Sequence, residues 1–198
     1  QVGAMSGPLI AALVLALRGV SRLIPGLWRA VPRQGAPGAA ATASIAVLPF
    51  VNMSGEQDNE YFSDGLSDEI TNALTNIREL RVAARTSAFA FKGREIDIRE
   101  VGKKLNVGAV LEGSVRKSGQ RLHITAQLVN VEDGFNIWSV QYDREMKDIF
   151  DIREEISLTI ADHLKLRLLK GEKEKILKRY TEDHEAYELY LKGHSFWK

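Results

Sequence analysis

The stretch SIAVLPFVNMSGEQDNEYFSDGLSDEIT, residues 44–71, joins a short apolar run to an acidic amphipathic segment and contains no Lys or Arg. The run SIAVLPF is rich in β-branched residues and ends at Pro49 and a polar turn, as a strand inside a sheet does. An apolar face in helical spacing follows, formed by Phe62, Leu66, Ile70, Leu74 and Ile77. A buried strand that leads into such a helix predicts an α/β domain.

The alternation of strand and helix continues after this stretch. The segment ELRVAA returns to an extended pattern, and DIREVGKKLN predicts a second helix. Asp97 is suited to cap the start of that helix, and Asn106 to end it in a left-handed conformation. The chain then alternates apolar and polar residues in RLHITAQLVNV, which predicts a half-buried strand preceded by a Ser-Gly hairpin turn.

A third strand and a long helix complete the pattern. Trp138, Val140 and Tyr142 share one face of FNIWSVQYDRE, which predicts the last strand of an antiparallel meander. The helix that follows has a buried stripe and a basic end, matching the helix dipole. The stripe is Ile149, Ile152, Ile156, Ile160 and Leu164, and the basic end is Lys165, Arg167 and Lys170. We therefore expect one α/β domain over residues 44–170, with a mixed sheet of about five strands in β-α-β-α-β-β-β-α order.

The segments outside residues 44–170 have different compositions. Residues 1–28 include the apolar run GPLIAALVLAL, which meets Arg18 and Arg22 and fits the end of a membrane anchor or an amphipathic surface helix. Residues 29–43 are rich in Ala, Pro and Gly and predict a linker. Residues 171–184 predict a charged spacer that is helical in part. Residues 185–198 resume helical periodicity, and such a lone helix needs more chain or a docking surface to bury its apolar face.

Composition excludes several function classes. The 198-residue chain has a formal net charge of +1, so nothing in its balance favours nucleic acid as a partner. It has no cysteine, and its four histidines are scattered without metal-ligand spacing. We expect no cofactor, no metal and no catalytic grouping in this chain.

The carboxylates of the opening stretch are the first candidate site. Glu56, Asp58, Glu60, Asp64, Asp68 and Glu69 could supply oxygen ligands to a cation or an acid/base pair. They lack the spacing of a calcium loop, and acids at the start of a helix are stabilised by its dipole. We interpret them as a structural helix entrance.

Two further segments are candidate partner-binding surfaces. ARTSAFAFKG follows a strand, where open α/β sheets bind ligands, and it holds Arg85, Thr86, Ser87, Phe89 and Phe91. The alternative is that both rings pack onto the sheet and that the arginine pairs with a carboxylate. The aromatic-rich final helix carries Tyr187 and Trp197, and its aromatic face either docks a partner or is the core of a repeat.

Taken together, the segments resemble the TolB-like amino-terminal domain family of bacterial envelope proteins. The resemblance rests on SIAVLPFVNMSG, YFSDGLSDEITNAL, LRVAARTSAFAFKG, DIREVGKKLNVGAVLEGSVRKSGQRLHITAQLVN and GFNIWSVQYDREMKDIFDIREEI. The tail EAYELYLKGHSFWK resembles the first helix after this domain in relatives with tetratricopeptide repeats. In such relatives the domain follows a membrane helix, behind a cytoplasmic cyclase, kinase or CadC-type DNA-binding domain.

The resemblance implies a non-enzymatic module that senses or scaffolds. It would bind protein or peptide partners, be anchored in the inner membrane of a Gram-negative bacterium and face the periplasm. One alternative is a small-molecule or nucleotide-binding regulatory domain in the cytosol. Another is the regulatory part of a protein named adenylate cyclase whose catalytic domain lies outside this sequence.

Overall fold

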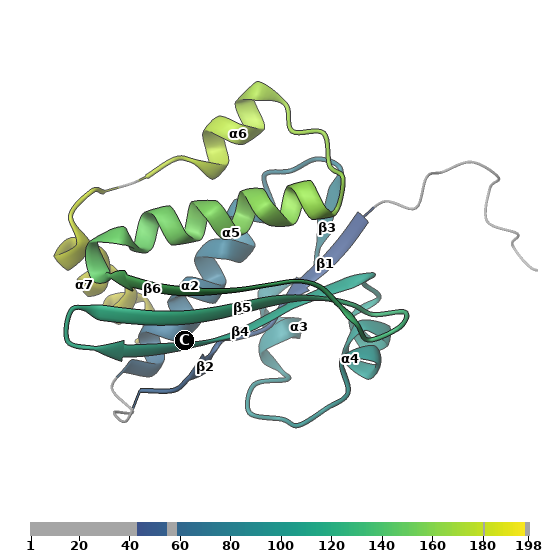
Figure 1. The fold of residues 1–198 in the computed structure, drawn as a ribbon, viewed down its shortest axis with the longest axis horizontal. Coiled ribbons are helices and arrows are strands. Elements are labelled where there is room, and N and C mark those ends of the chain that lie inside the picture. Colours follow the sequence, from purple (N-terminus) through teal and green to yellow (C-terminus); the bar gives the residue numbers. More distant parts are fainter. Residues whose placement is uncertain (1–42, 55–58, 180, 197–198) are drawn as a thin grey trace, which may run out of the picture. The chain divides into compact units, whose positions relative to one another are not determined.

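A six-stranded mixed sheet with helices on both faces forms the domain in the computed structural model, which describes residues 43–54, 59–179 and 181–196 (Figure 1). The strands are β1 Ala43–Val47, β2 Val51–Asn52, β3 Leu80–Val82, β4 Ala109–Ser118, β5 Arg121–Asn130 and β6 Asn136–Glu145. The helices are α2 Glu60–Leu74, α3 Arg85–Phe89, α4 Ile98–Leu105, α5 Ile149–His163, α6 Lys170–Ile176 and α7 His184–Ser195. A single 3₁₀ turn, Met146–Asp148, joins β6 to α5.

The sheet has the strand order β3-β1-β4-β5-β6. β3, β1 and β4 are parallel, whereas β4, β5 and β6 form the expected antiparallel meander. β2 pairs with β4 in parallel and continues the line of β1 along that strand. The two are separate strands because Pro49, which lies between them, cannot donate a hydrogen bond to the ladder. The predicted α/β class and mixed sheet are confirmed, and β2 accounts for a sixth strand beyond the five expected.

Two apolar cores lie on opposite faces of the sheet. The main core lies between the sheet and α2, α5, α6 and α7. A smaller core around Val101 and Val110 lies under α3 and α4, which Figure 1 shows on the other side of the sheet from α5. The small second layer leaves the outer part of β4, β5 and β6 uncovered on that face. This bare face of the sheet carries the polar side chains of these strands.

The predicted periodicities are confirmed at the level of single residues. Leu122, Ile124, Ala126 and Leu128 on β5 are all 0% exposed. The predicted face of α2 is buried, as are Ile149, Ile152, Ile156 and Ile160 on α5. The Asp97 side chain accepts a hydrogen bond from the amide of Arg99, and Asn106 ends α4 with a φ of 54°. Gly119 takes a φ of 55° in the β4–β5 turn.

Helix α5 is shorter than the sequence predicted. It ends at His163, and Lys165 adopts a φ of 54°, so the basic residues placed at its end follow the helix instead. The reason is that Leu164, Leu166 and Leu168 alternate, as in an extended segment, and all three pack against the main core. Their burial ends the helix one turn early.

The C-terminal helix docks on the body of the domain. Tyr187 and Leu191 of α7 are 5% and 3% exposed and belong to the main core. Gly65 of α2 permits this contact, because a Cβ there would lie 2.6 Å from Leu191 Cδ2. Within the predicted spacer, α6 contributes the buried Ile176 to the same core. The helix predicted to need a docking surface therefore finds one on α2.

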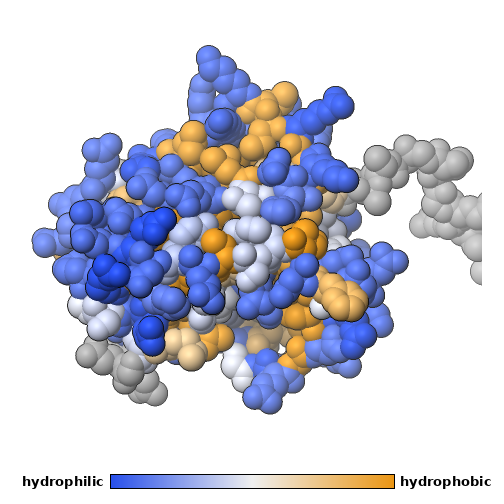
Figure 2. All heavy atoms as spheres, in the orientation of Figure 1, coloured by the Kyte–Doolittle hydropathy of each residue, from blue (hydrophilic) through white to orange (hydrophobic). Residues whose placement is uncertain are grey.

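The predicted anchor, residues 1–28, and nearly all of the linker, 29–43, lie outside the described residues. Within the part of the chain that the structure describes, no helix is both long and apolar enough to span a membrane. Figure 2 shows a mainly hydrophilic surface on the face that it presents, with an apolar cluster over α6. Leu169 and Leu177, at the two ends of α6, are exposed.

Candidate functional site

The carboxylates of α2 are held in ion pairs with neighbouring elements. Lys92 Nζ lies 2.6 Å from both Glu60 Oε1 and Asp64 Oδ1. Asp68 pairs with Arg85 and Glu69 pairs with Arg153, and His194 Nδ1 lies 4.0 Å from Asp68 Oδ2. Each partner is basic and comes from outside α2. Among the described residues no group of three or more acidic or histidine side chains is placed to hold a metal ion, and Glu56 and Asp58 lie outside those residues.

The predicted ligand-binding segment after β3 is folded as the short helix α3. The guanidinium of Arg85 pairs with Asp68 and stacks over the ring of Phe89, 3.8 Å from its centroid. The ion pair of Arg85 matches the alternative interpretation of the sequence, in which the arginine pairs with a carboxylate, whereas the ring of Phe89 stacks on Arg85. Thr86 and Ser87 are exposed, whereas Phe91 is half-buried against the second core. Of the five candidate binding residues in this segment, Phe91 alone lines the groove described next.

A groove of about 490 Å³ runs between the loop after α3 and the bare face of the sheet. Phe91 and residues 92–95 form one wall, and Leu48, Pro49 and Val51 form another. Its floor consists of side chains from β4 and β5, where Ser114 and Thr125 hydrogen-bond to each other at 2.8 Å. The groove therefore has a polar floor, an apolar wall and a wall in which Phe91 is followed by the charged Lys92, Arg94 and Glu95.

Glu112 is the ionisable group that distinguishes the groove. It lies on the groove floor, half-buried, and among the described residues no base or hydrogen-bond donor contacts its carboxylate. Burial raises the pKa of Glu112 above its ordinary value, because the desolvated carboxylate has no compensating charge. An ionisable group with a shifted pKa inside a groove is a candidate functional group.

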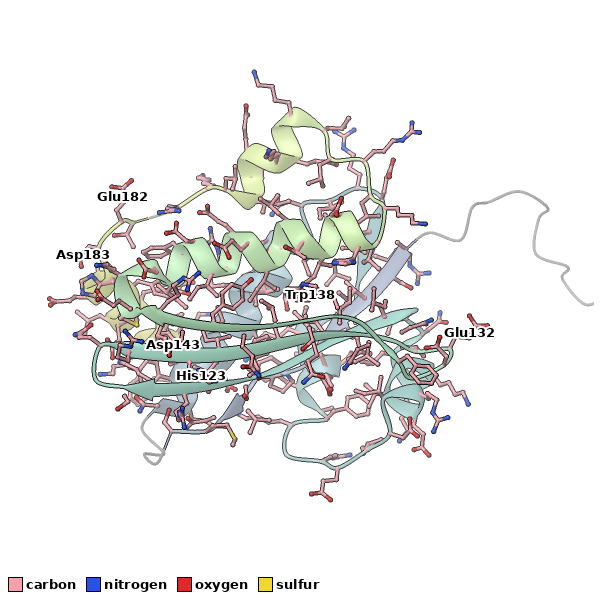
Figure 3. The ribbon with its side chains drawn as sticks, viewed as in Figure 1. His123, Glu132, Trp138, Asp143, Glu182 and Asp183 are labelled. Carbon is pink, nitrogen blue, oxygen red and sulfur yellow. The ribbon has the colours of Figure 1, made fainter. Side chains whose placement is uncertain are left out.

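The bare face extends the groove along the sheet. Two smaller hollows, about 280 and 150 Å³, continue from Ser114 and Thr125 to Arg116 and His123. His123 and Asp143 are cross-strand partners on β5 and β6 and lie close together in Figure 3. Beyond Glu112 this face therefore carries Arg116, His123 and Asp143 among polar side chains.

The two aromatic candidates of the terminal helix have different outcomes. Tyr187 is buried, and its ring packs edge-on against Phe150 with centroids 4.8 Å apart. It therefore supports the docking of α7 and is not part of a free surface. Trp197 lies outside the described residues. The structure does not bring these two residues together with the segment around Arg85 into one site.

Sequence reasoning did not single out Glu112. Strand alternation places Glu112, Ser114 and Arg116 on one face of β4, and this signal is present in the sequence. It does not reveal that the loop after α3 covers Glu112 but leaves Arg116 open, because that depends on a tertiary contact.

The mixed sheet and the uneven helical layers define an α/β domain with a groove over one face of its sheet. The chain belongs to the family described as HilA/YgeH-like transcriptional regulator, second domain, which matches residues 41–159. This supports the sequence-based assignment to a bacterial regulator module, and the narrower TolB-like assignment stays a prediction.

One relative and two solved structures illustrate the similarity. A protein of Rhizobium meliloti (strain 1021) named "Putative adenylate cyclase 3" is 43% identical over 157 residues, which are 79% of this chain and 27% of that protein. TolB from Acinetobacter baumannii is 15% identical, with a TM-score of 0.46 over 62% of this chain and 28% of that one. Lipoprotein GNA1162 from Neisseria meningitidis is 20% identical, with a TM-score of 0.44 over 52% of this chain and 80% of that one. These two likenesses carry no argument about function.

The unpaired carboxylate predicts a pH-dependent effect of Glu112→Gln. The pKa of Glu112 is higher in the folded state than in the unfolded state. The side chain therefore favours folding fully at pH values below its unfolded pKa, and this stabilisation is lost as the pH rises through its folded pKa. The variant has no charge to desolvate. We expect its free energy of unfolding to exceed that of the native chain by a few tenths of a kcal/mol at about pH 7, with the difference vanishing at about pH 4. Urea unfolding at both pH values measures this, and equal stabilities at both would contradict it.

Proposed function

We propose that this chain is the non-catalytic regulatory part of a longer protein and that its groove binds an extended segment of a protein or peptide partner. The observation that carries the proposal is Glu112, which lies in a preformed groove and whose carboxylate contacts no basic side chain among the described residues. A Lys or Arg side chain of the partner would supply that charge. The free energy lost in desolvating the carboxylate would be offset when it forms a charge-assisted hydrogen bond.

The length of the groove favours a polypeptide over a small solute. The groove and the two hollows beyond it follow β4 and β5 from Glu112 to His123, and Ser114 and Thr125 line both the groove and the nearer hollow. Val51 and Met53 at its side are 58% and 60% exposed, which offers apolar contacts to alternate side chains of an extended segment.

The family and the relative support an output domain located elsewhere. The family is described as the second domain of transcriptional regulators, and the chain spans 27% of the length of its cyclase-named relative. Two different outputs, transcription and nucleotide cyclisation, would then be attached to one kind of module. Such sharing is expected of a domain whose role is to bind rather than to catalyse.

An array of seven-residue peptides tests the groove directly. The peptides carry Lys, Gln or Glu at the central position and varied residues elsewhere, and the purified 198-residue chain is the probe. We expect the Lys-centred set to bind best and to lose about tenfold in affinity with Glu112→Gln, because a charge-assisted hydrogen bond is lost.

The control for the array is Glu132→Gln, which removes an exposed carboxylate from the β5–β6 turn outside the groove. This variant should bind the Lys-centred peptides as the native chain does. Absence of binding, or equal binding by Glu112→Gln, would show that the groove does not take a basic peptide.

We also propose that the domain faces the periplasm of a Gram-negative bacterium, tethered to the inner membrane. The proposal rests on the apolar residues 7–28, the linker that follows them and the family resemblance of the sequence. The cytosolic alternative places residues 7–28 in an amphipathic helix at a surface.

A topology assay distinguishes the two locations. Alkaline phosphatase or a cytosol-only fluorescent reporter is fused after Lys198 in the native bacterium, beyond α6 and α7, because both helices contribute to the main core. We expect phosphatase activity without fluorescence. Fluorescence without phosphatase activity would refute the periplasmic location and favour a cytosolic regulatory domain.

A further inference from the structure

A second cavity, of about 560 Å³, lies between α2, α5 and the docked helix α7. Its volume falls in the range of pockets that hold small molecules. Aromatic side chains form much of its lining, namely Phe150, Tyr187 and Tyr190. It shares no lining residue with the groove over Glu112, so it is a separate site.

The charges in this cavity already balance each other. Arg153 Nη1 donates to Glu69 Oε2 at 3.1 Å, and Arg153 Nη2 donates to the carbonyl oxygens of Ile176 and Lys178. The side chains of Arg153 and Glu69 are only 6% and 14% exposed, so the pair is held in place. A charged ligand would have to be desolvated without gaining a free counter-charge, which is costly. The cavity therefore favours a neutral molecule.

Tyr187 provides a hydrogen-bond donor in the lining of the cavity. The residue is 5% exposed, and among the described residues nothing accepts a hydrogen bond from its hydroxyl. Burial first, and then the charge of Glu69, raise the pKa of Tyr187, so the hydroxyl stays protonated and is a hydrogen-bond donor. Because Tyr187 lines the cavity, a ligand oxygen inside it can accept a hydrogen bond from this hydroxyl.

We propose that this cavity binds a small neutral molecule that has a flat apolar body and a carbonyl or hydroxyl oxygen. The body would contact Phe150 and Tyr190, and the oxygen would accept a hydrogen bond from the Tyr187 hydroxyl. Because α7 supplies part of the lining, the bound molecule would also stabilise the docking of α7 on α2. The site would thus couple occupancy to the position of the C-terminal helix, independently of the groove.

N-Benzylacetamide is a suitable probe, since it joins a phenyl ring to a neutral amide carbonyl. Its binding to the 198-residue chain is measured by ¹H–¹⁵N NMR titration, with benzylamine and phenylacetate as charged analogues of similar size. We expect a dissociation constant on the order of 1 mM for the amide. Binding of either charged analogue should be about tenfold weaker, because each would enter without a free counter-charge. Equal binding by an analogue would overturn the assignment to neutral ligands.

Three variants locate the site. Tyr187→Phe keeps the ring and removes the hydroxyl, and it should weaken N-benzylacetamide binding about fivefold, the effect of one neutral hydrogen bond. Ala186→Trp should abolish binding by filling the mouth of the cavity, because residue 186 is exposed and lines it. Leu189→Trp is the matched control, since Leu189 is exposed on α7 but does not line the cavity.

Three results of these binding measurements would overturn the proposal. Native affinity in Tyr187→Phe and Ala186→Trp, or no binding to the native chain, would overturn the proposal. Loss of binding in Leu189→Trp would show that the probe binds elsewhere on α7, which also overturns it. The peptide array reports on the groove alone, so failure of this cavity leaves the result for Glu112 unaffected.

Discussion

Helix α2 is the element on which the arrangement of the whole domain depends. Its apolar face, including Phe62, Leu66 and Ile70, is completely buried in the main core. Full burial of each such side chain stabilises the fold by about 1.5 to 3 kcal/mol. Its polar face holds the carboxylates that fix α3 and α5, and its Ser67 hydroxyl accepts the amide hydrogen of Phe50 at 2.9 Å. Gly65 leaves the space that α7 needs.

These ion pairs give the carboxylates of α2 a structural role, so neither a catalytic nor a cation-binding role is needed to explain them. A carboxylate that is paired with a base from a neighbouring element is neutralised and is not free to bind a cation. Glu112 is different because burial raises its pKa and no base in the described part of the chain contacts its carboxylate. The functional interest of the domain therefore moves from the helix entrance to the groove over the sheet and, on the opposite side, to the cavity beside α7.

The sequence predicted what depends on local pattern. The alternation in β5, the cap at Asp97 and the left-handed Asn106 were each predictable, because strand pleat and helix ends constrain individual residues. It did not predict the stacking of Arg85 on Phe89, the early end of α5 or the covering of Glu112. These features depend on contacts between segments far apart in the chain, such as Arg85 with Asp68. The predicted partner-binding segment adjoins the groove, and Phe91 is the predicted binding residue that lines it.

A double-mutant cycle on Asp68 and Arg85 tests most directly whether the α2 carboxylates are structural. Their side chains are 8% and 29% exposed. Asp68→Asn, Arg85→Gln and the double variant are compared with the native chain by urea unfolding at about pH 7. We predict a coupling energy of about 1 to 3 kcal/mol, because either single change removes the ion pair and leaves the other partly buried charge in place. Free energies that add to within about 0.3 kcal/mol would contradict it and reopen Asp68 and Arg85 as candidate binding residues.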